Sequence, residues 1–310
     1  MTVYVLHENP DWFPPFAAAF EAAGLAYEEW LLTSGMIDLD ATPPEGVFWN
    51  RLSASAHTRD HPFAKDYTRA LLDWLEAHRR RVVTGRSVVE LEVSKVRQLT
   101  ALQSFGIDVP RTVAVIGRDD LLGAAAKLPT PFITKHNQGG KGLGVRRFDD
   151  LDAFAAYVAS DEFEAPVDGI TLLQEYVRPR DGFITRVETV GYEYVYAITA
   201  DAARGGFQLC PADACELDEA GRPVEAASLF ALREDFAHPI IDAYLGFAQR
   251  HELEIAGFEF IETSDGRLVT YDVNTNTNYN PEVEAVAPRS GPASIAAYLE
   301  RVFTETYALT

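Results

Sequence analysis

The sequence predicts a protein of mixed class, α/β in its first part and α+β in its second, and three observations support this prediction. The chain has 310 residues, so two or three packed domains are expected. Residues 1–90 alternate short apolar runs with helical runs, which is typical of a small parallel sheet. From residue 92 onward strand-like runs dominate with helices interspersed, which favours antiparallel pairing.

The first ninety residues predict four strands and two long helices. The strands are expected at residues 3–8, 27–32, 47–50 and 81–85, where the runs are short and apolar. The helices are expected at residues 15–23, which Gly24 follows, and at residues 61–80, where Leu71, Leu72 and Leu75 share one face.

The remaining residues predict five helices and nine strands. The helices are expected at residues 93–105, 119–127, 151–158, 236–251 and 294–303. The strands are expected at residues 113–116, 132–136, 144–148, 171–177, 183–190, 193–199, 207–210, 255–263 and 268–273. With residues 161–168 as a linker, the chain divides into domains of residues 1–90, 91–168 and 169–310.

Composition and charge exclude several classes of function. The formal net charge of -20 repels nucleic-acid phosphates and anionic lipid, so neither is expected as a partner. The chain shows no signal peptide and no apolar run of about 20 residues, which predicts a cytoplasmic protein. Cys210 and Cys215 are expected to be reduced thiols. The sequence leaves the oligomeric state open, a homo-oligomer included.

The segment 257–274 predicts a hairpin that brings two carboxylates together. Asp265-Gly266 between alternating apolar runs indicates a two-residue loop, which sets Glu259 opposite Asp272. Asn274 lies two residues further along and shares that face. Like charges directly opposite one another destabilise a sheet unless a cation relieves them, and oxygen ligands suit Mg²⁺. A solvated acidic face on an edge hairpin is the alternative.

A glycine-rich loop follows the strand at residues 132–136. This strand carries Lys135 near its end, and four glycines follow within nine residues. Such a loop can place backbone amides over phosphates while lysine supplies charge. The spacing fits neither a P-loop nor Gly-x-Gly-x-x-Gly, and strands on both sides indicate a flap. An ordinary hairpin turn is the alternative. The candidate phosphate-binding residues are Lys135, Gly139, Gly140, Lys141 and Gly142.

The strand at residues 172–177 stops before Pro179, and the next strand carries Arg186. Exposed backbone groups at a strand end can bind an adenine edge, and an arginine on the adjoining sheet can hold a phosphoryl group. Taken alone, the segment fits a plain strand, a turn and a surface arginine better.

The order of these elements resembles the ATP-grasp superfamily, and within it the RimK-like and glutathione-synthetase-like carboxylate–amine ligases. The resemblance runs from about Glu92 to Asn280. Residues 1–90 match as the small α/β domain that precedes an ATP-grasp fold. The resemblance implies a ligase that uses ATP and Mg²⁺, with Mn²⁺ also possible, and that joins an acid to an amine through an acyl phosphate. The substrates it implies are small-molecule or peptide carboxylates and amines.

The resemblance also implies roles for individual residues. Lys95 and Lys135 would bind phosphates, and Arg186 would stabilise the transferring phosphoryl group. The metal ligands would be Glu259, Asp272 and Asn274. The remaining nucleotide contacts would be Glu175, Tyr176, Val177 and Gln208.

The sequence departs from the family pattern at several of these positions. Glu259 and Asp272 are exchanged in length, and Ile184 stands where a ribose-binding acid is expected, with Asp181 as the substitute candidate. Residues 274–280 read Asn-Thr-Asn-Thr-Asn-Tyr-Asn where a Pro-Gly is usual after the first asparagine. Residues 208–210 replace an Arg-Ser-Asn stretch. Both of the last two segments border the site expected for the acceptor.

Candidate substrate contacts come from strand ends and from the asparagine-rich run. Asn9 and Arg51 follow the first and third strands, at the edge of a parallel sheet where ligands usually bind. Arg51 can hold a carboxylate with two hydrogen bonds, or it can be a surface arginine that caps a loop. Asn276 is the third candidate. The alternative functions are a phosphotransferase, a nucleotide-binding protein without catalysis, and a structural α/β protein.

Overall fold

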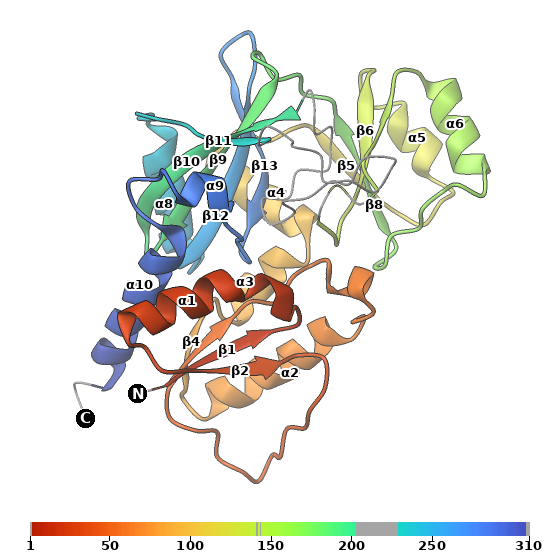
Figure 1. Ribbon diagram of the computed structural model, residues 1–310. Coiled ribbons are helices and arrows are strands. Elements are labelled where there is room, and N and C mark those ends of the chain that lie inside the picture. The colour runs from red at the N-terminus through yellow and green to blue at the C-terminus, as the bar shows by residue number, and fades with distance from the viewer. Residues whose placement is uncertain (1, 141, 143, 203–228, 308–310) are drawn as a thin grey trace, which may run out of the picture.

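The computed structural model describes residues 2–140, 142, 144–202 and 229–307, and its strands form three separate sheets (Figure 1). Lys141 and Gln208, the strand expected at residues 207–210, and both cysteines lie outside the described residues. Among the helices that are described, none is long and apolar enough to span a membrane.

The first sheet is parallel, as predicted for the first ninety residues. It contains β1 (Val3–His7), β2 (Tyr27–Leu31), β3 (Val47–Asn50) and β4 (Arg81–Val83) in the order β2-β1-β3-β4. α1 (Pro14–Ala23) buries Phe16 and Phe20 in one core, and α2 (Ala64–Ala77) buries Leu71, Leu72 and Leu75 in another. Two short 3₁₀ helices, Pro10–Trp12 and Ala56–Arg59, follow the ends of β1 and β3.

The second sheet is antiparallel and contains β5 (Thr112–Ile116), β6 (Phe132–His136), β7 (Arg146–Phe148) and β8 (Ile170–Glu175) in the order β5-β8-β6-β7. α5 (Leu121–Ala125) and α6 (Leu151–Ala159) share its apolar core. Because β8 pairs with β5 and β6, a division at residues 168 and 169 would separate this strand from its sheet. We therefore propose a domain boundary after Glu175.

The third sheet is also antiparallel. Its strands are β9 (Phe183–Val190), β10 (Glu193–Asp201), β11 (Phe230–Leu232), β12 (Ile255–Glu262) and β13 (Leu268–Asn274), in the order β11-β10-β9-β12-β13. α8 (Ile240–Arg250) packs in the core of one face, whereas α10 (Gly291–Tyr307) packs in a core shared with α1. The mixed class expected from the sequence is confirmed.

Several short elements were not predicted, and several predicted helices, among them those of α2, α5 and α8, extend beyond the observed ones. α3 (Arg86–Glu92) and α4 (Lys95–Ser104) are separate helices, because Ser94 caps α4 by accepting a hydrogen bond from the Arg97 amide. β11 and α9 (Pro281–Glu284) have only three and four residues, too few to give a periodic signal.

The hairpin of β12 and β13 has the predicted register at its functional end, but it reaches that register by a different route. Glu259 pairs with Asp272, and Gly257 pairs with Asn274, as expected. The expected two-residue loop is wrong, because Thr263 and Arg267 already bond to each other and Gly266 closes the turn at φ +85. The register then shifts between Glu259 and Phe260, so a bulge at Tyr271 compensates for the longer loop.

The core beneath this hairpin can be tested by truncation. Phe258 is fully buried, and its ring stacks on Tyr244 with centroids 4.4 Å apart. We predict that Phe258→Ala lowers the free energy of unfolding by about 3–5 kcal/mol. Phe63 is 77% exposed, so Phe63→Ala should change it by no more than about 0.5 kcal/mol. Urea denaturation measures both changes, and equal effects would contradict this packing.

Candidate active site

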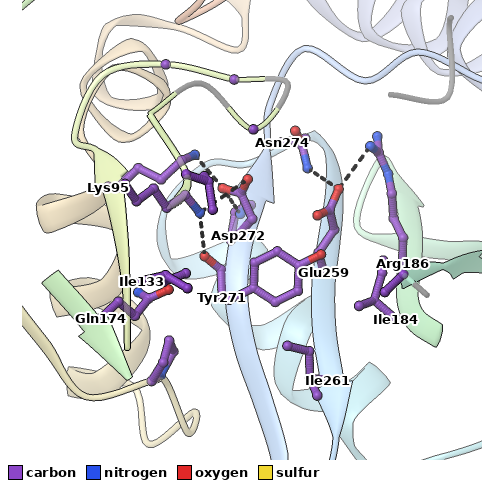
Figure 2. A pocket seen from close by; sticks show the side chains of 18 of the residues that line it. Lys95, Ile133, Gln174, Ile184, Arg186, Glu259, Ile261, Tyr271, Asp272 and Asn274 are labelled. Carbon is purple, nitrogen blue, oxygen red and sulfur yellow. Dashed lines mark hydrogen bonds and ion pairs between the residues drawn. The ribbon is translucent and has the colours of Figure 1, made fainter. Parts of the chain in front are cut away.

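A cavity of about 560 Å³ is lined by residues of the second and third sheets and by the segments that follow β1 and β3 of the first sheet. Its lining combines the loop after β3, the start of α4, the second sheet with its glycine-rich loop, and the strands β9, β12 and β13. Figure 2 shows side chains from α4, the second sheet and these three strands around the cavity. The volume lies in the range of small-molecule sites. Of the residues proposed from the sequence, the lining includes Lys95, Lys135, Gly139, Gly140, Gly142, Glu175, Tyr176, Val177, Arg186, Glu259, Asp272, Asn274 and Asn276.

The two paired carboxylates point into this cavity from neighbouring strands (Figure 2). Glu259 Oε1 accepts a hydrogen bond from Asn274 Nδ2 at 2.9 Å and lies 3.3 Å from Arg186 Nη1. In a regular strand Tyr271 and Asp272 would face opposite sides, whereas the bulge lets both line the cavity. The bulge therefore sets the position of Asp272 as well as its register.

Two buried lysines balance the charge of Asp272. Lys95 Nζ donates to Asp272 Oδ1 at 2.5 Å, and Lys135 Nζ lies 3.9 Å from Oδ2. Burial would raise the pKa of the Asp272 carboxyl, but Lys135 and Lys95 hold it below its usual value. Burial lowers the pKa of Lys135 to about 8, although Asp272 opposes that shift. Burial also opposes the charge of Lys95, yet Asp272 keeps its pKa above the usual value.

Each lysine is positioned by the element that carries it. Lys95 is the first residue of α4, and Asn137 holds this helix start by accepting hydrogen bonds from the Lys95 amide at 3.1 Å and from the Val96 amide at 2.9 Å. Lys135 lies in β6, directly before the glycine-rich loop. The loop and the helix start are thus tied together at the cavity.

A closely packed group holds Arg186 in β9. Its Nε donates to Glu188 Oε1 at 2.5 Å, while Nη2 is buried with no hydrogen-bond partner among the described residues. Burial would lower the pKa of Arg186, but Glu188 and Glu259 raise it. Burial raises the pKa of Glu188 to about 7 despite the arginine. Sequence analysis missed Glu188, although its position two residues from Arg186 on one strand indicates a shared face.

Gly257 provides the space that the Arg186 guanidinium occupies. A Cβ atom at Gly257 would lie 2.6 Å from Arg186 Nε and 2.8 Å from Nη2, both closer than normal contacts. Any larger residue at this position must displace the guanidinium. The glycine is therefore required by close approach, since its backbone is that of an ordinary strand.

The residues expected to bind the adenine lie at the end of β8. Glu175, Tyr176 and Val177 line the cavity, with Ile133, Ile184 and Ile261 as apolar neighbours. Glu175 Oε1 accepts a hydrogen bond from the Arg111 amide at 3.0 Å, and the Tyr176 amide donates to the Pro131 carbonyl at 3.3 Å. Ile184 is buried in the lining, whereas Asp181 is paired with Arg180 and does not line the cavity.

The glycine-rich loop lies against the first domain. Gly140 lies beside Ser55, where an added Cβ would be 3.6 Å from the serine Cβ. Gln138 Oε1 accepts a hydrogen bond from Lys65 Nζ at 2.9 Å. Gly144 has φ +69, and a Cβ there would collide with the His136 ring at 2.2 Å. Sequence analysis missed Ser53, Ser55 and Trp12 in the lining, because only tertiary packing brings them there.

The structure corrects the prediction for Arg51. Its side chain does not line the cavity, and it is only 2% exposed. Arg51 Nη2 donates to the Thr277 carbonyl at 3.2 Å and to Asn278 Oδ1 at 3.0 Å, and the guanidinium lies over the rings of Phe16 and Trp49. It is therefore neither a free carboxylate-binding group nor a surface arginine.

Asn9 also takes a structural position. It caps the 3₁₀ helix after β1 by accepting a hydrogen bond from the Asp11 amide at 3.2 Å, and it does not line the cavity. Asn276 is the one proposed substrate contact that does.

The donor set at the centre of the cavity fits a hard divalent cation that also binds phosphate. The described part of the chain contains no group of three His, Cys, Asp or Glu side chains placed to hold a metal. Glu259 and Asp272 are two carboxylates, and Asn274 keeps an amide oxygen because its nitrogen donates to Glu259. Mg²⁺ is usually held by one or two carboxylates together with substrate phosphates, which is what this set can offer.

The space around Arg186 can be tested with two glycine variants. We predict that Gly257→Ala destabilises the fold by about 1–3 kcal/mol, because the new Cβ displaces the guanidinium. Gly123→Ala in α5 is the matched control, since its Cβ would meet no atom within 4 Å. That change should stabilise the fold by up to about 1 kcal/mol. Urea denaturation compares them, and a neutral Gly257→Ala would contradict the close approach.

Comparison with known proteins finds relatives that are named as ligases. No family model matches the chain. It is 27% identical over 224 residues to ribosomal protein bS6–L-glutamate ligase of Shigella boydii serotype 4, covering 69% of this chain and 66% of that protein. It is 27% identical over 219 residues to the probable alpha-L-glutamate ligase of Enterobacter sp. strain 638, with the same coverage. The match thus spans just under two thirds of the length of these relatives.

Solved structures match over nearly the whole chain. A RimK domain ATP-grasp protein from Sphaerobacter thermophilus has a TM-score of 0.66 at 16% identity, covering 97% of this chain and 100% of that one. D-cycloserine synthetase DcsG has a TM-score of 0.65 at 18% identity, covering 97% and 99%. The ligase PsnB, solved with a precursor variant, Mg and ADP, has a TM-score of 0.63 at 14% identity, covering 97% and 98%. These likenesses show the fold.

Proposed function

We propose that this chain, which belongs to the ATP-grasp superfamily and is RimK-like, is an ATP- and Mg²⁺-dependent carboxylate–amine ligase. One observation carries the proposal: Glu259 and Asp272 face each other in the cavity, within reach of Lys95 and Arg186. The relatives named as ligases support the reaction class.

The nucleotide would lie between the second and third sheets. Its base would lie near the end of β8, among Ile133, Ile184 and Ile261. Its phosphates would extend toward Lys95 and Lys135, under the backbone amides of Gly139 and Gly140. We include Lys141 and Gln208 in the nucleotide-binding set on the resemblance alone, since both lie outside the described residues.

The metal would be held by Glu259, Asp272 and the Asn274 oxygen together with ATP phosphates. When bound there, Mg²⁺ would neutralise charge on the phosphoryl oxygens. Mn²⁺ prefers the same kind of oxygen donors and is a candidate substitute.

Catalysis then needs positioning and charge rather than a side-chain nucleophile. An oxygen of the substrate carboxylate attacks the γ-phosphorus, and the bond to the bridging oxygen breaks with its electron pair leaving on ADP. Arg186 stabilises the charge on the transferring group through Nη2, which has no hydrogen-bond partner in the part of the chain that the structure describes. The amine attacks the carbonyl carbon of the acyl phosphate, inorganic phosphate leaves, and the nitrogen loses a proton to give the amide.

Amino acids or peptides are the substrates that we propose. Among the relatives, the bS6 ligase is named for a ribosomal protein and L-glutamate, and PsnB and MdnC were solved with precursor peptides. A phosphotransferase on the same fold is the second candidate. The two differ in products, because a ligase releases free phosphate only when the amine is present, whereas a phosphotransferase retains the phosphoryl group on its acceptor.

The metal assignment can be tested with one isosteric change. We predict that Glu259→Gln lowers phosphate release by about 10²-fold, because one of two carboxylates at the metal is lost. This variant leaves the lysine pairs of Asp272 intact, so it should fold. Glu262→Gln, three residues along the same strand and outside the cavity, is the matched control and should keep parental activity. A screen of amino acids and small peptides for Mg²⁺-dependent phosphate release measures both, and full activity in Glu259→Gln would remove this residue from the metal site.

The role of Arg186 can be tested by measuring ATP binding and turnover separately. We predict that Arg186→Lys binds ATP with a Kd within about threefold of the parent but turns over about 10³-fold more slowly, the scale of losing a charge-stabilising arginine. Arg180→Lys is the control, because Arg180 is nearly half exposed and does not line the cavity. Calorimetric titration and single-turnover kinetics measure the two quantities. Unchanged turnover in Arg186→Lys would exclude it from catalysis.

A further inference from the structure

We infer that Asn276 and Asn278 recognise an amide group of the second substrate, so that the cavity beyond Asn274 selects an uncharged, amide-bearing molecule. The inference rests on the proposed function, because it assigns the substrate class at one end of the same cavity. The amide can belong to a peptide chain or to a small carboxamide, and the two share the same hydrogen-bonding groups.

The chain after β13 alternates its side chains between the cavity and the protein interior. Asn274, Asn276 and Asn278 line the cavity. Thr275, Thr277 and Tyr279, which lie between and after them, are buried. This alternation turns three carboxamides to the cavity, whose lining also includes Ser53, Ser55 and Trp12.

The hydrogen bonds that each carboxamide already makes determine which of its atoms is available to a substrate. Asn278 Oδ1 accepts a hydrogen bond from Arg51 Nη2 at 3.0 Å, so its Nδ2 group is left as a donor. Asn276 Oδ1 is buried and has no hydrogen-bond partner among the described residues. An acceptor at Asn276 and a donor at Asn278 complement the N–H and C=O of one amide group.

Arg51 fixes the orientation of Asn278. A guanidinium has only donors, so the atom of Asn278 that faces it must be the carboxamide oxygen. The guanidinium is held between the Phe16 and Trp49 rings and also donates to the Thr277 carbonyl, which leaves it little freedom to turn. Arg51 is therefore a positioning residue for the carboxamides.

The charges that line the cavity favour an amide over a carboxylate at this end. The described lining at this end holds no cation: Trp12, Ser53, Ala54, Ser55, Asn276 and Asn278 are uncharged. Glu92, which accepts hydrogen bonds from the Ala54 and Thr275 amides, adds a carboxylate there. The cations in the described lining belong to α4, the second sheet with the segment after β8, and β9: Lys95, Lys135, Arg147, Arg178 and Arg186. Arg51 and Arg59 lie near this end but outside the lining, where Arg51 donates to Thr277 and Asn278 and Arg59 pairs with Glu8. A carboxylate bound beside the asparagines would lose water without gaining a cation in the described lining, which is unfavourable. An amide loses less and pairs with both carboxamides.

A binding panel tests the inference without relying on turnover. The twenty free amino acids, their carboxamides and the corresponding N-acetylated dipeptide amides are titrated calorimetrically into protein with Mg²⁺ and a non-hydrolysable ATP analogue. We expect at least one amide to bind about tenfold or more tightly than every free amino acid. Tighter binding of the dipeptide amides would identify a peptide chain, and tighter binding of the single carboxamides a small molecule. Equal or tighter binding of a free amino acid, or no binding of any amide, would overturn the inference.

Side-chain variants separate recognition from folding. Asn276→Leu keeps the shape without the acceptor oxygen and should weaken amide binding about tenfold, whereas Asn276→Asp keeps an acceptor and should weaken it less. Gln103→Ala removes an exposed carboxamide from α4 and is the control. The Kd of the ATP analogue should be unchanged in all three. Equal amide affinity in Asn276→Leu and the parent would contradict the assignment.

The positioning role of Arg51 can be tested by a separate variant. Arg51→Lys keeps the charge but loses the planar fork, and it should weaken amide binding while the ATP analogue binds normally. Amide affinity equal to that of the parent would contradict a positioning role.

If amides bind as expected but no acid and amine pair releases phosphate, the proposed ligase function fails and this inference stands. If free amino acids alone support phosphate release and no amide binds, the ligase function stands and this inference fails.

Discussion

The pairing of Glu259 with Asp272 across β12 and β13 is the interaction on which the rest of the site depends. Two carboxylates in a largely buried cavity repel each other and lose water, so they persist only with cations nearby. Lys95 from α4, Lys135 from β6 and Arg186 from β9 meet this need. One electrostatic requirement thus draws the second and third sheets toward one point.

The same lysines and carboxylates would exchange partners when a nucleotide binds. Lys95 and Lys135 pair with Asp272, and removing one partner of such a buried pair would cost about 3–5 kcal/mol. We propose that the lysines would hold the phosphates while Glu259, Asp272 and Asn274 would hold Mg²⁺, which would neutralise the carboxylates. Charge then stays balanced throughout binding.

The sequence predicted this pairing correctly, but for a partly wrong reason. A two-residue loop and a regular strand would give the observed register, and so do the observed three-residue loop and the bulge at Tyr271. The residues of the turn do not reveal the bulge, which only the strand register of the folded protein shows. The parallel first sheet was predictable because short apolar runs alternate with helices, of which α2 is long and periodic.

Residues whose environment depends on distant segments could not be assigned from the sequence. Arg51 follows a strand end as a ligand-binding arginine would, yet Phe16 and Asn278, which lie far from it in the chain, enclose it. The need for glycine at position 257 arises from Arg186 on another strand. The local sequence pattern determines a secondary-structure element and the face on which each side chain lies. The burial of a side chain and its hydrogen-bond partners depend on tertiary packing.

The fate of a carboxylate oxygen tests most directly whether this site activates an acid by phosphorylating it. A substrate acid labelled with ¹⁸O in both carboxylate oxygens is turned over with ATP, Mg²⁺ and an amine, and the inorganic phosphate is analysed by mass spectrometry. An acyl phosphate transfers one labelled oxygen to each phosphate released, and this is the result we predict. Unlabelled phosphate, formed alongside the amide product, would contradict the account.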